Sequence, residues 1–514
     1  MKSRFRISQH SQLLRARAAH GVHCRSMCAT NETSSRCAPS RKNISARMLS
    51  ESSTHHSAAA NFCSKSKECA MSAERIYDCL VIGAGPAGSA AAIEMARAGL
   101  DVLVLDRGEF PRFRIGESFL PRTKRAFRRL GVLDKCLALP HARKIGVEIS
   151  LGDWRHGSQY FFFRDVFGDG DKETFNMARI HLDQMMMESA REAGAEVQTS
   201  CALRAVTRME DGDVVVDSDA GTVRARWMID ASGQATTLAR ERDQRRFHSF
   251  LRNVAYFEHF EHVIRPSGKG QNCFALVIAD EGWFWMIPLD DTRTSIGFVA
   301  RESLHRTLDV PPEDRLRWAI ARTPVLRERM ANAIGPDKNR VISDFTYRCD
   351  PFAGPGHFLI GDAAAFLDPV WSTGLTLGLL GAEQAANSVI RMFTGPLSQR
   401  TTAATERTRH HRWTKRITDR AFRLVEGFYD PAFRDLLFSP KRTKGLERAF
   451  ITLLAGEIDS IPFGVGVRCQ ALRGLCAIQS RHAVAARVRP FKIMLSSPVT
   501  MPSVTADVAH ADAT

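Results

Sequence analysis

The sequence predicts an α/β protein in which a dinucleotide-binding domain is assembled from separated segments, with a β-rich domain inserted into it and a helical region after it. Three patterns support this fold class. A strand, a glycine turn and a helix follow one another between Tyr77 and Asp106, a second strand leads through glycine into a long helix between His357 and Ala386, and residues 422–458 have helical periodicity. We place the first domain at 75–395, the inserted domain at about 150–175 and 241–340, and the helical region at 396–495.

The positive charge of the chain is concentrated in its first 70 residues. They contain 12 Lys and Arg against 3 Asp and Glu, a net of +9, which leaves +7 of the total of +16 for the rest of the chain. No dominant basic run remains, so we expect no nucleic-acid partner. Residues 1–70 are predicted to be disordered or removable, either because translation starts at Met71, which we favour, or because they form an organellar transit peptide. Residues 496–514 are also expected to be disordered.

Composition also limits the compartment and the chemistry. The chain lacks the apolar core of a secretory signal and lacks a run of about 18 apolar residues. We therefore expect no membrane span and a cytoplasmic protein, or an organellar one if residues 1–70 are a transit peptide. Of the 12 cysteines, 5 lie in the tail and the others form no CxxC pair, which favours reduced thiols and predicts no metal site.

The stretch "YDCLVIGAGPAGSAAAIEMARAGLDVLVLD" is a βαβ unit with a dinucleotide fingerprint. Gly83 permits the tight turn, Gly85 lets the backbone approach a pyrophosphate, and Gly88 allows close helix packing, while Ala87 lies in the turn that faces the ligand. Asp106 follows Gly88 by 18 residues and is placed to bind a ribose hydroxyl pair. This motif predicts a dinucleotide but does not distinguish NAD from FAD.

A second segment favours FAD. "HFLIGDAAAFLDPVWSTGLTLGLLGAEQAA" resembles the second flavin-binding element of the p-hydroxybenzoate hydroxylase-like flavoproteins. The resemblance implies that Asp362 contacts the ribityl and phosphate region and that the following helix, from about Leu375, points at the isoalloxazine. It also implies that Arg179 in "ARIHLDQ" contacts FAD, and the stretch "DASGQATTLAR" fits the same family. The first domain is therefore expected to be a discontinuous, FAD-binding Rossmann-like domain.

Two tryptophans stand one residue apart in "GWFWMIPL", residues 282–289. The alternation predicts a strand with Trp283, Trp285 and Ile287 on one face and Pro288 at its end, which by itself describes an ordinary half-buried strand. The pattern W-x-W-x-I-P also resembles the signature of the flavin-dependent halogenases. We expect the two tryptophans to shape a cavity and assign them no catalytic step.

"FLDPVWSTG", residues 366–374, fits the F-x-x-P-x-x-S-x-G pattern of the same family, whose members bind chloride beside the flavin. The resemblance makes the amides of Thr373 and Gly374 the halide donors. Consecutive amides at a helix start form a small anion-binding nest, which is favourable for a halide. The alternative is that these amides contact only the flavin ring, as in a hydroxylase. Further residues of the two patterns are expected to shape the cavity, namely Pro288, Phe366, Pro369 and Trp371.

Lys144 is the third feature that resembles these halogenases, which carry a lysine at the start of such a strand. A single lysine is usually a solvated surface group, and Lys124 and Lys135 are rivals by position. Glu117 and Ser118, in "FPRFRIGESFLPR", are expected to line the flavin. An alternative interpretation is that Arg112 and Arg114, in the same segment, are only surface charges.

The resemblance implies the reaction. Reduced FAD, O2 and chloride or bromide yield hypohalous acid, which travels inside the protein, and Lys144 holds or carries the electrophilic halogen toward an electron-rich aromatic. Trp371 stands where tryptophan halogenases have a glutamate, so we expect a phenol or pyrrole substrate, either free or tethered to an acyl-carrier protein. The sequence has one dinucleotide fingerprint, so FADH2 is expected from a separate NAD(P)H-dependent flavin reductase. The alternatives are an aromatic hydroxylase, a prenyl-type reductase and a flavin-binding protein without chemistry.

Overall fold

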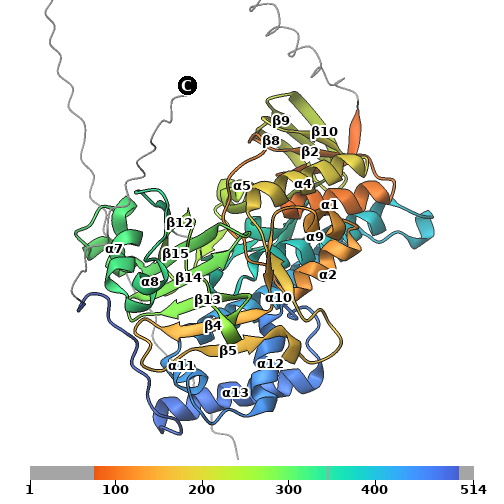
Figure 1. Ribbon diagram of the computed structural model, residues 1–514. Helices are drawn as coiled ribbons and strands as arrows, with labels where there is room; N and C mark the ends of the chain where they lie inside the picture. Colours follow the sequence, from red (N-terminus) through yellow and green to blue (C-terminus); the bar gives the residue numbers. More distant parts are fainter. Residues whose placement is uncertain (1–74, 344–345, 497–514) are drawn as a thin grey trace, which may run out of the picture. The chain divides into compact units, whose positions relative to one another are not determined.

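The computed structural model describes residues 75–343 and 346–496 (Figure 1). The expectations for residues 1–70 and for the end of the chain beyond residue 496 concern residues outside this range. Five parallel strands form the main part of the first sheet, in the order β19-β10-β1-β2-β7. Its strands are β1 (Ile76–Ile82), β2 (Val102–Leu105), β7 (Glu196–Gln198), β8 (Leu203–Glu210), β9 (Asp213–Ser218), β10 (Gly221–Asp230), β18 (Ala353–Gly354) and β19 (His357–Leu359).

Three helices pack together against this sheet. They are α1 (Pro86–Arg97), α4 (Arg179–Glu192) and α9 (Gly374–Phe393). Small residues bring α1 close to the second strand-to-helix segment: a Cβ on Gly361 would lie 3.3 Å from the Cβ of Ala87, and one on Gly378 would lie 3.4 Å from it. The two dinucleotide elements predicted from widely separated parts of the sequence are therefore in direct contact.

The three glycines of the fingerprint meet different constraints. Gly83 has a φ of +105°, and a Cβ there would lie 2.4 Å from the carbonyl oxygen of Ala231. A Cβ on Gly88 would lie 1.9 Å from the carbonyl oxygen of Gly83. Gly85, by contrast, has an extended backbone with φ −68°, and a Cβ there would meet only the Arg112 guanidinium, at 3.8 Å. Gly83 and Gly88 are thus required for packing, whereas Gly85 leaves space beside the start of α1.

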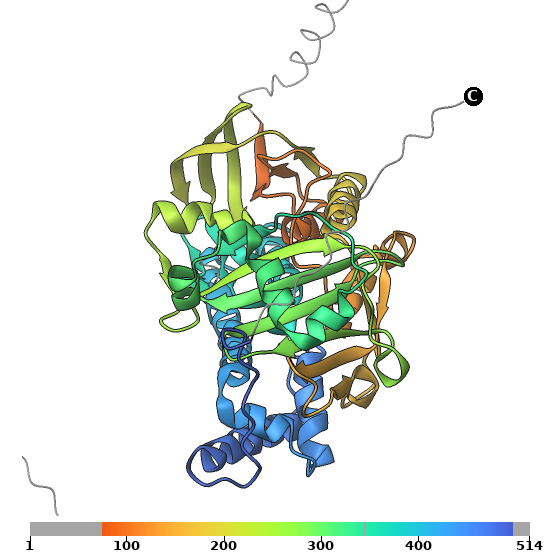
Figure 2. The same ribbon diagram turned by 60° about the vertical axis from the view of Figure 1, so that its left-hand side comes forward.

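The inserted sheet has seven strands in the order β16-β12-β15-β14-β13-β4-β5. Figure 2 shows α7 (Arg315–Arg322) and α8 (Pro324–Arg329) lying across one of its faces. Its strands are β4 (Gly146–Leu151), β5 (Gln159–Phe162), β12 (Asn253–Phe260), β13 (Cys273–Ile278), β14 (Gly282–Pro288), β15 (Thr294–Arg301) and β16 (Arg340–Ser343).

Strand β14 contains the two tryptophans and confirms the predicted alternation. Trp283 and Trp285 lie in one hydrophobic core, and Phe284 and Met286 lie in another on the opposite face. The half-buried alternative is wrong, because neighbouring strands flank β14 on both edges and both faces are covered. Gly297 of β15 faces Trp285, and a Cβ there would come within 2.1 Å of the indole.

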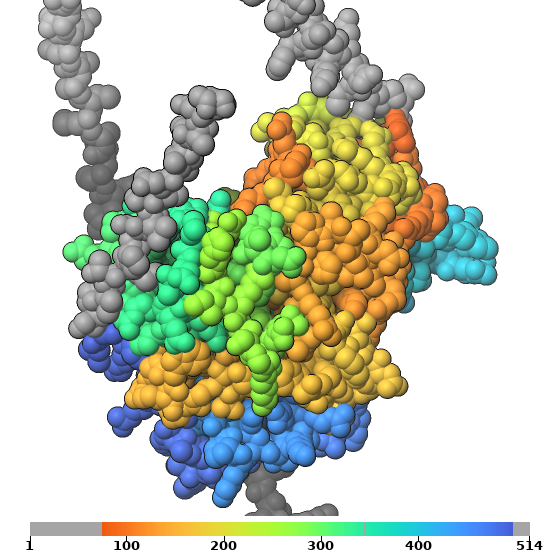
Figure 3. Space-filling model, viewed as in Figure 1, coloured from red at the N-terminus to blue at the C-terminus, as the bar shows by residue number. Residues whose placement is uncertain are grey.

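The C-terminal region is helical and packs against the β4–β5 end of the inserted sheet. Phe161 of β5 and Phe450 of α12 are in edge contact, with ring centroids 5.6 Å apart. Figure 3 shows the blue surface of these helices directly below the orange and gold surface of that sheet end. The helices are α10 (Ala403–Tyr429), α11 (Pro431–Leu437), α12 (Lys444–Leu454) and α13 (Phe463–Arg481). Together with the two sheets, they confirm the predicted fold class.

Shorter elements connect the sheets and helices. Strands β3 and β6 pair with each other, and β11, β17 and β20 form a small third sheet. Within residues 75–343 and 346–496, no helix has the length and apolarity needed to cross a membrane. The connecting elements are α2 (Pro121–Arg129), α3 (Leu133–Leu137), α5 (Thr237–Glu241), α6 (Glu302–Thr307), β3 (Ala142–Lys144), β6 (Thr174–Asn176), β11 (Arg245–Phe247), β17 (Tyr347–Cys349) and β20 (Ala365–Phe366).

The glycine geometry predicts that two alanine substitutions in one turn act differently. Gly88→Ala forces a methyl group against backbone and should lower the apparent Tm by at least about 5 °C. Gly85→Ala should leave the apparent Tm unchanged and reduce the FAD retained after gel filtration, because its methyl group stands where backbone must approach the pyrophosphate. Thermal unfolding and the visible flavin absorbance measure both. Full FAD retention in Gly85→Ala would contradict the assignment.

Candidate functional site

Asp106 lies at the end of β2, buried beside the glycine turn. Its Oδ2 accepts a hydrogen bond from the backbone N–H of Ala84 at 2.8 Å, and its Oδ1 accepts from Gly108 N at 2.8 Å and from Arg112 Nη1 at 2.6 Å. The reading of Arg112 as a mere surface charge is wrong, because its side chain is largely buried in this ion pair. The carboxylate is therefore held in a buried position next to the start of α1.

Arg179 and Asp362 come from two further segments of this domain. Arg179, the first residue of α4, forms a bidentate ion pair with Asp183, and its Nη1 donates a hydrogen bond to the carbonyl oxygen of Ile115 at 2.9 Å. Asp362 lies in a short turn after β19, where burial raises its pKa to about 6 and the nearby Arg179 opposes the rise. The structure thus brings the two predicted FAD contacts close enough to influence each other.

Glu117 and Ser118 precede α2 and are both buried. Oε1 of Glu117 lies 2.8 Å from Nε2 of His259 in an ion-pair contact, yet neither carboxylate oxygen has a hydrogen-bond partner within the described residues. Ser118 donates to Oδ1 of Asn176 at 2.9 Å. Glu117 is therefore a buried acceptor that the protein itself does not satisfy, as expected of a group that contacts a ligand.

Lys144 ends strand β3 and is completely buried. Its Nζ donates to Oγ of Ser118 at 2.8 Å and to the carbonyl oxygen of Phe119 at 2.9 Å, and it lies 4.5 Å from the ring centroid of Phe274. It has no carboxylate partner in the part of the chain that the structure describes. Burial lowers the pKa of this amine to about 7, slightly offset by Cys273. A large fraction of Lys144 is therefore neutral near neutral pH.

The other basic residues considered at this position have different surroundings. Lys135 is 41% exposed and ion-paired with Glu192, Lys124 is half-buried on α2, and Arg143 is 60% exposed and ion-paired with Glu173. Lys144 is the one fully buried lysine among the described residues. The geometry therefore distinguishes Lys144 from its rivals.

The proposed halide loop runs from Asp368 to the start of α9. Pro369–Trp371 form one turn of 3₁₀-helix, Ser372 is left-handed with φ 56°, and Thr373 returns to the right-handed region. Such a left-then-right pair turns successive N–H groups toward one side and builds an anion-binding nest at a helix start. Thr373 is buried, Gly374 is exposed with open space where a Cβ would stand, and Leu375 is half-buried in the first turn of α9.

The halide loop and the Lys144 segment are linked across α2 and α9. Oγ1 of Thr123, in the first turn of α2, lies 2.7 Å from Oγ1 of Thr376, in the first turn of α9. Lys144 bonds the carbonyl of Phe119, just before α2. The hydrogen bonds therefore hold the two predicted halogen-handling elements in a fixed relation.

Trp371 is buried against the C-terminal region. Its indole N–H donates to the carbonyl oxygen of Leu424 at 3.0 Å, and its ring meets Phe428 and Phe450 edge-on at 5.3 and 5.5 Å. Trp283 also meets Phe428 edge-on, at 6.0 Å, so one phenyl ring of α10 lies between the two signatures. Three other residues were expected to shape the cavity: Pro288 is buried at the end of β14, whereas Phe366 and Pro369 are half-buried.

A buried hydrogen-bond network lies beside this aromatic cluster, and sequence reasoning missed three of its members. Trp283 Nε1 donates to the hydroxyl of Tyr429 at 3.0 Å, and that hydroxyl donates to Oδ2 of Asp368 at 2.7 Å. Asn253 Nδ2 donates to the same oxygen at 2.8 Å. Burial raises the pKa of Asp368 to about 6, against the effect of these donors. The missed members are Asp368, Asn253 and Tyr429; only Asp368 lies in a motif, where nothing distinguishes it as a buried acceptor.

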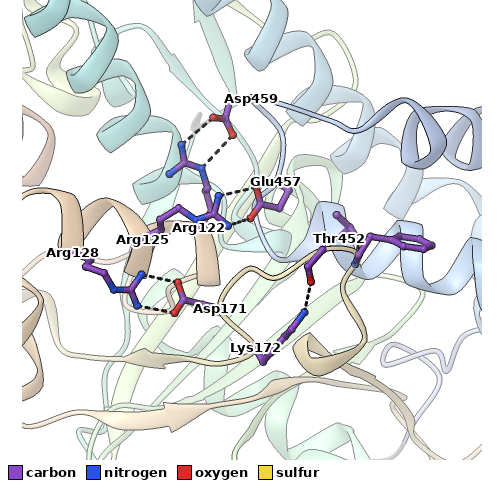
Figure 4. Close-up of polar contacts among 10 residues, drawn as sticks. Arg122, Arg125, Arg128, Asp171, Lys172, Thr452, Glu457 and Asp459 are labelled. Atoms are coloured by element: carbon purple, nitrogen blue, oxygen red, sulfur yellow. Dashed lines mark hydrogen bonds and ion pairs between the residues drawn. The ribbon is translucent and has the colours of Figure 1, made fainter.

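A cleft of about 720 Å³ lies apart from these residues, between α2, residues 167–171 and the segment after α12. Figure 4 shows three ion pairs at this junction. The pairs are Arg122–Asp459 at 2.9 Å, Arg125–Glu457 at 2.5 Å and Arg128–Asp171 at 2.8 Å. Their charges balance, so we interpret the cleft as the seam that fastens the C-terminal region to α2. Each partly exposed pair is worth about 1 kcal/mol or less.

The donor set fits a flavin dinucleotide. The open position at Gly85 and the free N–H groups of the first turn of α1 suit a pyrophosphate, and the carboxylate of Asp106 suits a ribose diol. Arg179, Asp362 and the unsatisfied Glu117 oxygens provide further polar partners for such a ligand.

Comparison with known proteins agrees with this interpretation. The FAD binding domain family matches residues 76–421. A curated relative, the 1H-pyrrole-2-carbonyl peptidyl-carrier-protein brominase of Pseudoalteromonas luteoviolacea, is 32% identical over 334 residues, covering 63% of this chain and 80% of the relative.

Among solved structures, a flavoprotein/dehydrogenase from Cytophaga hutchinsonii is 26% identical with a TM-score of 0.71, covering 79% of this chain and 99% of that chain. The flavin-dependent brominase Bmp2 is 26% identical with a TM-score of 0.68, covering 78% and 99%. The chain therefore belongs to the FAD-binding domain family and, within it, to the flavin-dependent halogenases, which are FAD-dependent oxidoreductases.

Proposed function

We propose that the protein uses FADH2, O2 and chloride or bromide to halogenate an electron-rich aromatic of the phenol or pyrrole type, with Lys144 delivering the halogen. The observation that carries the proposal is the environment of Lys144. Its amine is fully buried, lacks a carboxylate partner within the described residues, and has a pKa lowered to about 7. A lysine in such a site is a nucleophile, whereas an arginine would remain cationic.

Reduced FAD, when bound, supplies the chemistry that converts O2 and a halide ion into hypohalous acid. The amides of Thr373 and Gly374 hold the halide at the start of α9. The neutral amine of Lys144 has two N–H groups, which donate to Ser118 Oγ and to the carbonyl of Phe119, and one lone pair. The lone pair takes the halogen from hypohalous acid, and the hydroxide that leaves combines with an amine proton to form water. The aromatic carbon then takes the halogen from nitrogen and loses its proton, which regenerates the amine.

The position of Trp371 supports a substrate that needs no base from this loop. Phenols and pyrroles are electron-rich without deprotonation by the enzyme, and the indole at Trp371 offers no carboxylate. We infer a substrate of this class, chlorinated or brominated, and a dry passage in which Trp283 and Trp285 restrict free hypohalous acid.

Two observations support a substrate that is bound to a carrier protein. The name of the curated brominase describes a pyrrole carried on a peptidyl-carrier protein. In addition, the exposed side of α10 has a groove of about 470 Å³ whose single acid, Asp419, is ion-paired with Lys415 and Arg348. The groove is also bordered by three arginines that lack carboxylate partners within the described residues, namely Arg412, Arg416 and Arg423. Such a surface suits an acidic protein partner. A separate NAD(P)H-dependent flavin reductase completes the proposed system.

The test uses the full chain with FAD, a flavin reductase, NADH, O2 and bromide, offered phenols, free pyrroles and a pyrrole-2-carbonyl carrier protein. We expect monobrominated or polybrominated product by mass spectrometry, dependent on bromide. Hydroxylated product without halogen would favour the aromatic hydroxylase instead. Flavin turnover without any aromatic product in the whole panel would contradict the substrate class.

Lys144→Met should reduce aromatic halogenation at least about a hundredfold, because the amine that accepts the halogen is lost. FAD content and NADH consumption should persist, and trapping with monochlorodimedone should still detect hypohalous acid. Lys124→Met and Lys135→Met are matched controls and should retain activity. Loss of FAD binding in Lys144→Met would show that this lysine has a structural role instead.

A further inference from the structure

Asp368 fixes the first half of the halide loop from inside the protein. Its Oδ1 accepts from the backbone N–H of Val370 at 3.2 Å and caps the short 3₁₀ turn, while its Oδ2 accepts from Asn253 and from the hydroxyl of Tyr429. Asp368 is completely inaccessible to solvent. The orientation of this turn is therefore set by a hydroxyl that comes from the last residue of α10.

The same helix holds the second half of the loop. Trp371 is bonded to the carbonyl of Leu424 and packed against Phe428, both on α10. Between this anchor and the halide amides stands only Ser372, in a left-handed conformation that residues with a side chain rarely adopt. Such a conformation persists only where the surrounding structure maintains it. The anchors on α10 are the contacts that do so.

Trp283 is connected to the halide loop by a hydrogen bond to the hydroxyl of Tyr429. Its indole N–H donates to Tyr429, and Asn253 also contacts that hydroxyl, at 2.9 Å. The first tryptophan of W-x-W-x-I-P thus belongs to one hydrogen-bonded unit with the F-x-x-P-x-x-S-x-G loop, although the two motifs lie on different elements. The tryptophan restricts where the Tyr429 hydroxyl can point.

We propose that Tyr429 is a positioning residue for halide binding, which acts through Asp368 on the conformation of residues 368–374, and that Trp283 acts on this loop through Tyr429. This inference rests on the proposed function, because it assumes that the loop amides bind halide. It assigns the C-terminal helix α10 a part in forming the halide site. Deleting the Tyr429 hydroxyl removes one of the two donors to Oδ2 of Asp368, so that the carboxyl is held less tightly and the loop relaxes at Ser372.

The test is bromide titration of the full chain carrying oxidised FAD, followed by the visible difference spectrum of the flavin at constant ionic strength. Tyr429→Phe should raise the bromide dissociation constant about five- to tenfold, and Trp283→Phe should raise it less. In turnover, Tyr429→Phe should raise the KM for bromide and leave the KM for the aromatic unchanged. The flavin content should match the wild type.

Tyr256→Phe is the matched control. Tyr256 is a buried tyrosine whose hydroxyl is hydrogen-bonded to Arg315 and His305, in the other core of the inserted sheet. The Tyr256→Phe substitution should lower the apparent Tm without changing the bromide affinity. Equal bromide affinity in Tyr429→Phe and wild type would overturn the inference and leave the proposed function intact, and so would an equal loss in both tyrosine variants. Failure of the wild type to bind bromide would overturn the halide site and the inference together.

Discussion

A buried amine that has no counter-ion among the described residues is the constraint on which the candidate site depends. A pKa of about 7 instead of 10.5 means that the charged form of Lys144 is disfavoured by roughly 5 kcal/mol relative to water. Because the unfolded chain binds this proton more tightly, the contribution of Lys144 to the free energy of unfolding should fall as the pH drops from about 10.5 to about 7, and this contribution then changes no further. The neutral amine is stabilised in this position because it donates hydrogen bonds to Oγ of Ser118 and to the carbonyl oxygen of Phe119. A buried, largely neutral amine at ordinary pH is the basis of the proposed role of Lys144.

The C-terminal helices complete the site from outside the two sheets. Helix α10 contributes a tyrosine hydroxyl, a backbone carbonyl and a phenyl ring to residues 368–371, and ion pairs farther along fasten the same region to α2. Helix α2 begins two residues after Phe119, whose carbonyl oxygen accepts a hydrogen bond from Lys144, so the C-terminal region contacts residues next to both proposed elements, Lys144 and the halide loop. The C-terminal helices thus fix the conformation of residues 368–371 through contacts that lie beyond the flavin motifs.

Much of the fold was predictable because it follows from local rules. The glycine fingerprint, the acid at the end of β2 and the alternation in β14 each have a short-range physical cause, and the structure shows the predicted elements. The half-buried interpretation of β14 was wrong because a local pattern carries no information on what covers the second face. Lys144 was identified only by resemblance to a family, since its burial arises from residues far away in sequence. Tyr429 and Asn253 could not be predicted, because their contacts with Asp368 are purely tertiary.

The central claim concerns the protonation of one amine, and the most direct measurement is a pH titration of Lys144 in the FAD-bound protein. Lysine labelled with ¹³C at Cε reports this by NMR, and Lys144→Met assigns the resonance. The account predicts one lysine that titrates with a midpoint near 7, as its neutral form is favoured by burial. It would be contradicted if the resonance missing from Lys144→Met titrated near 10.5, together with the exposed lysines.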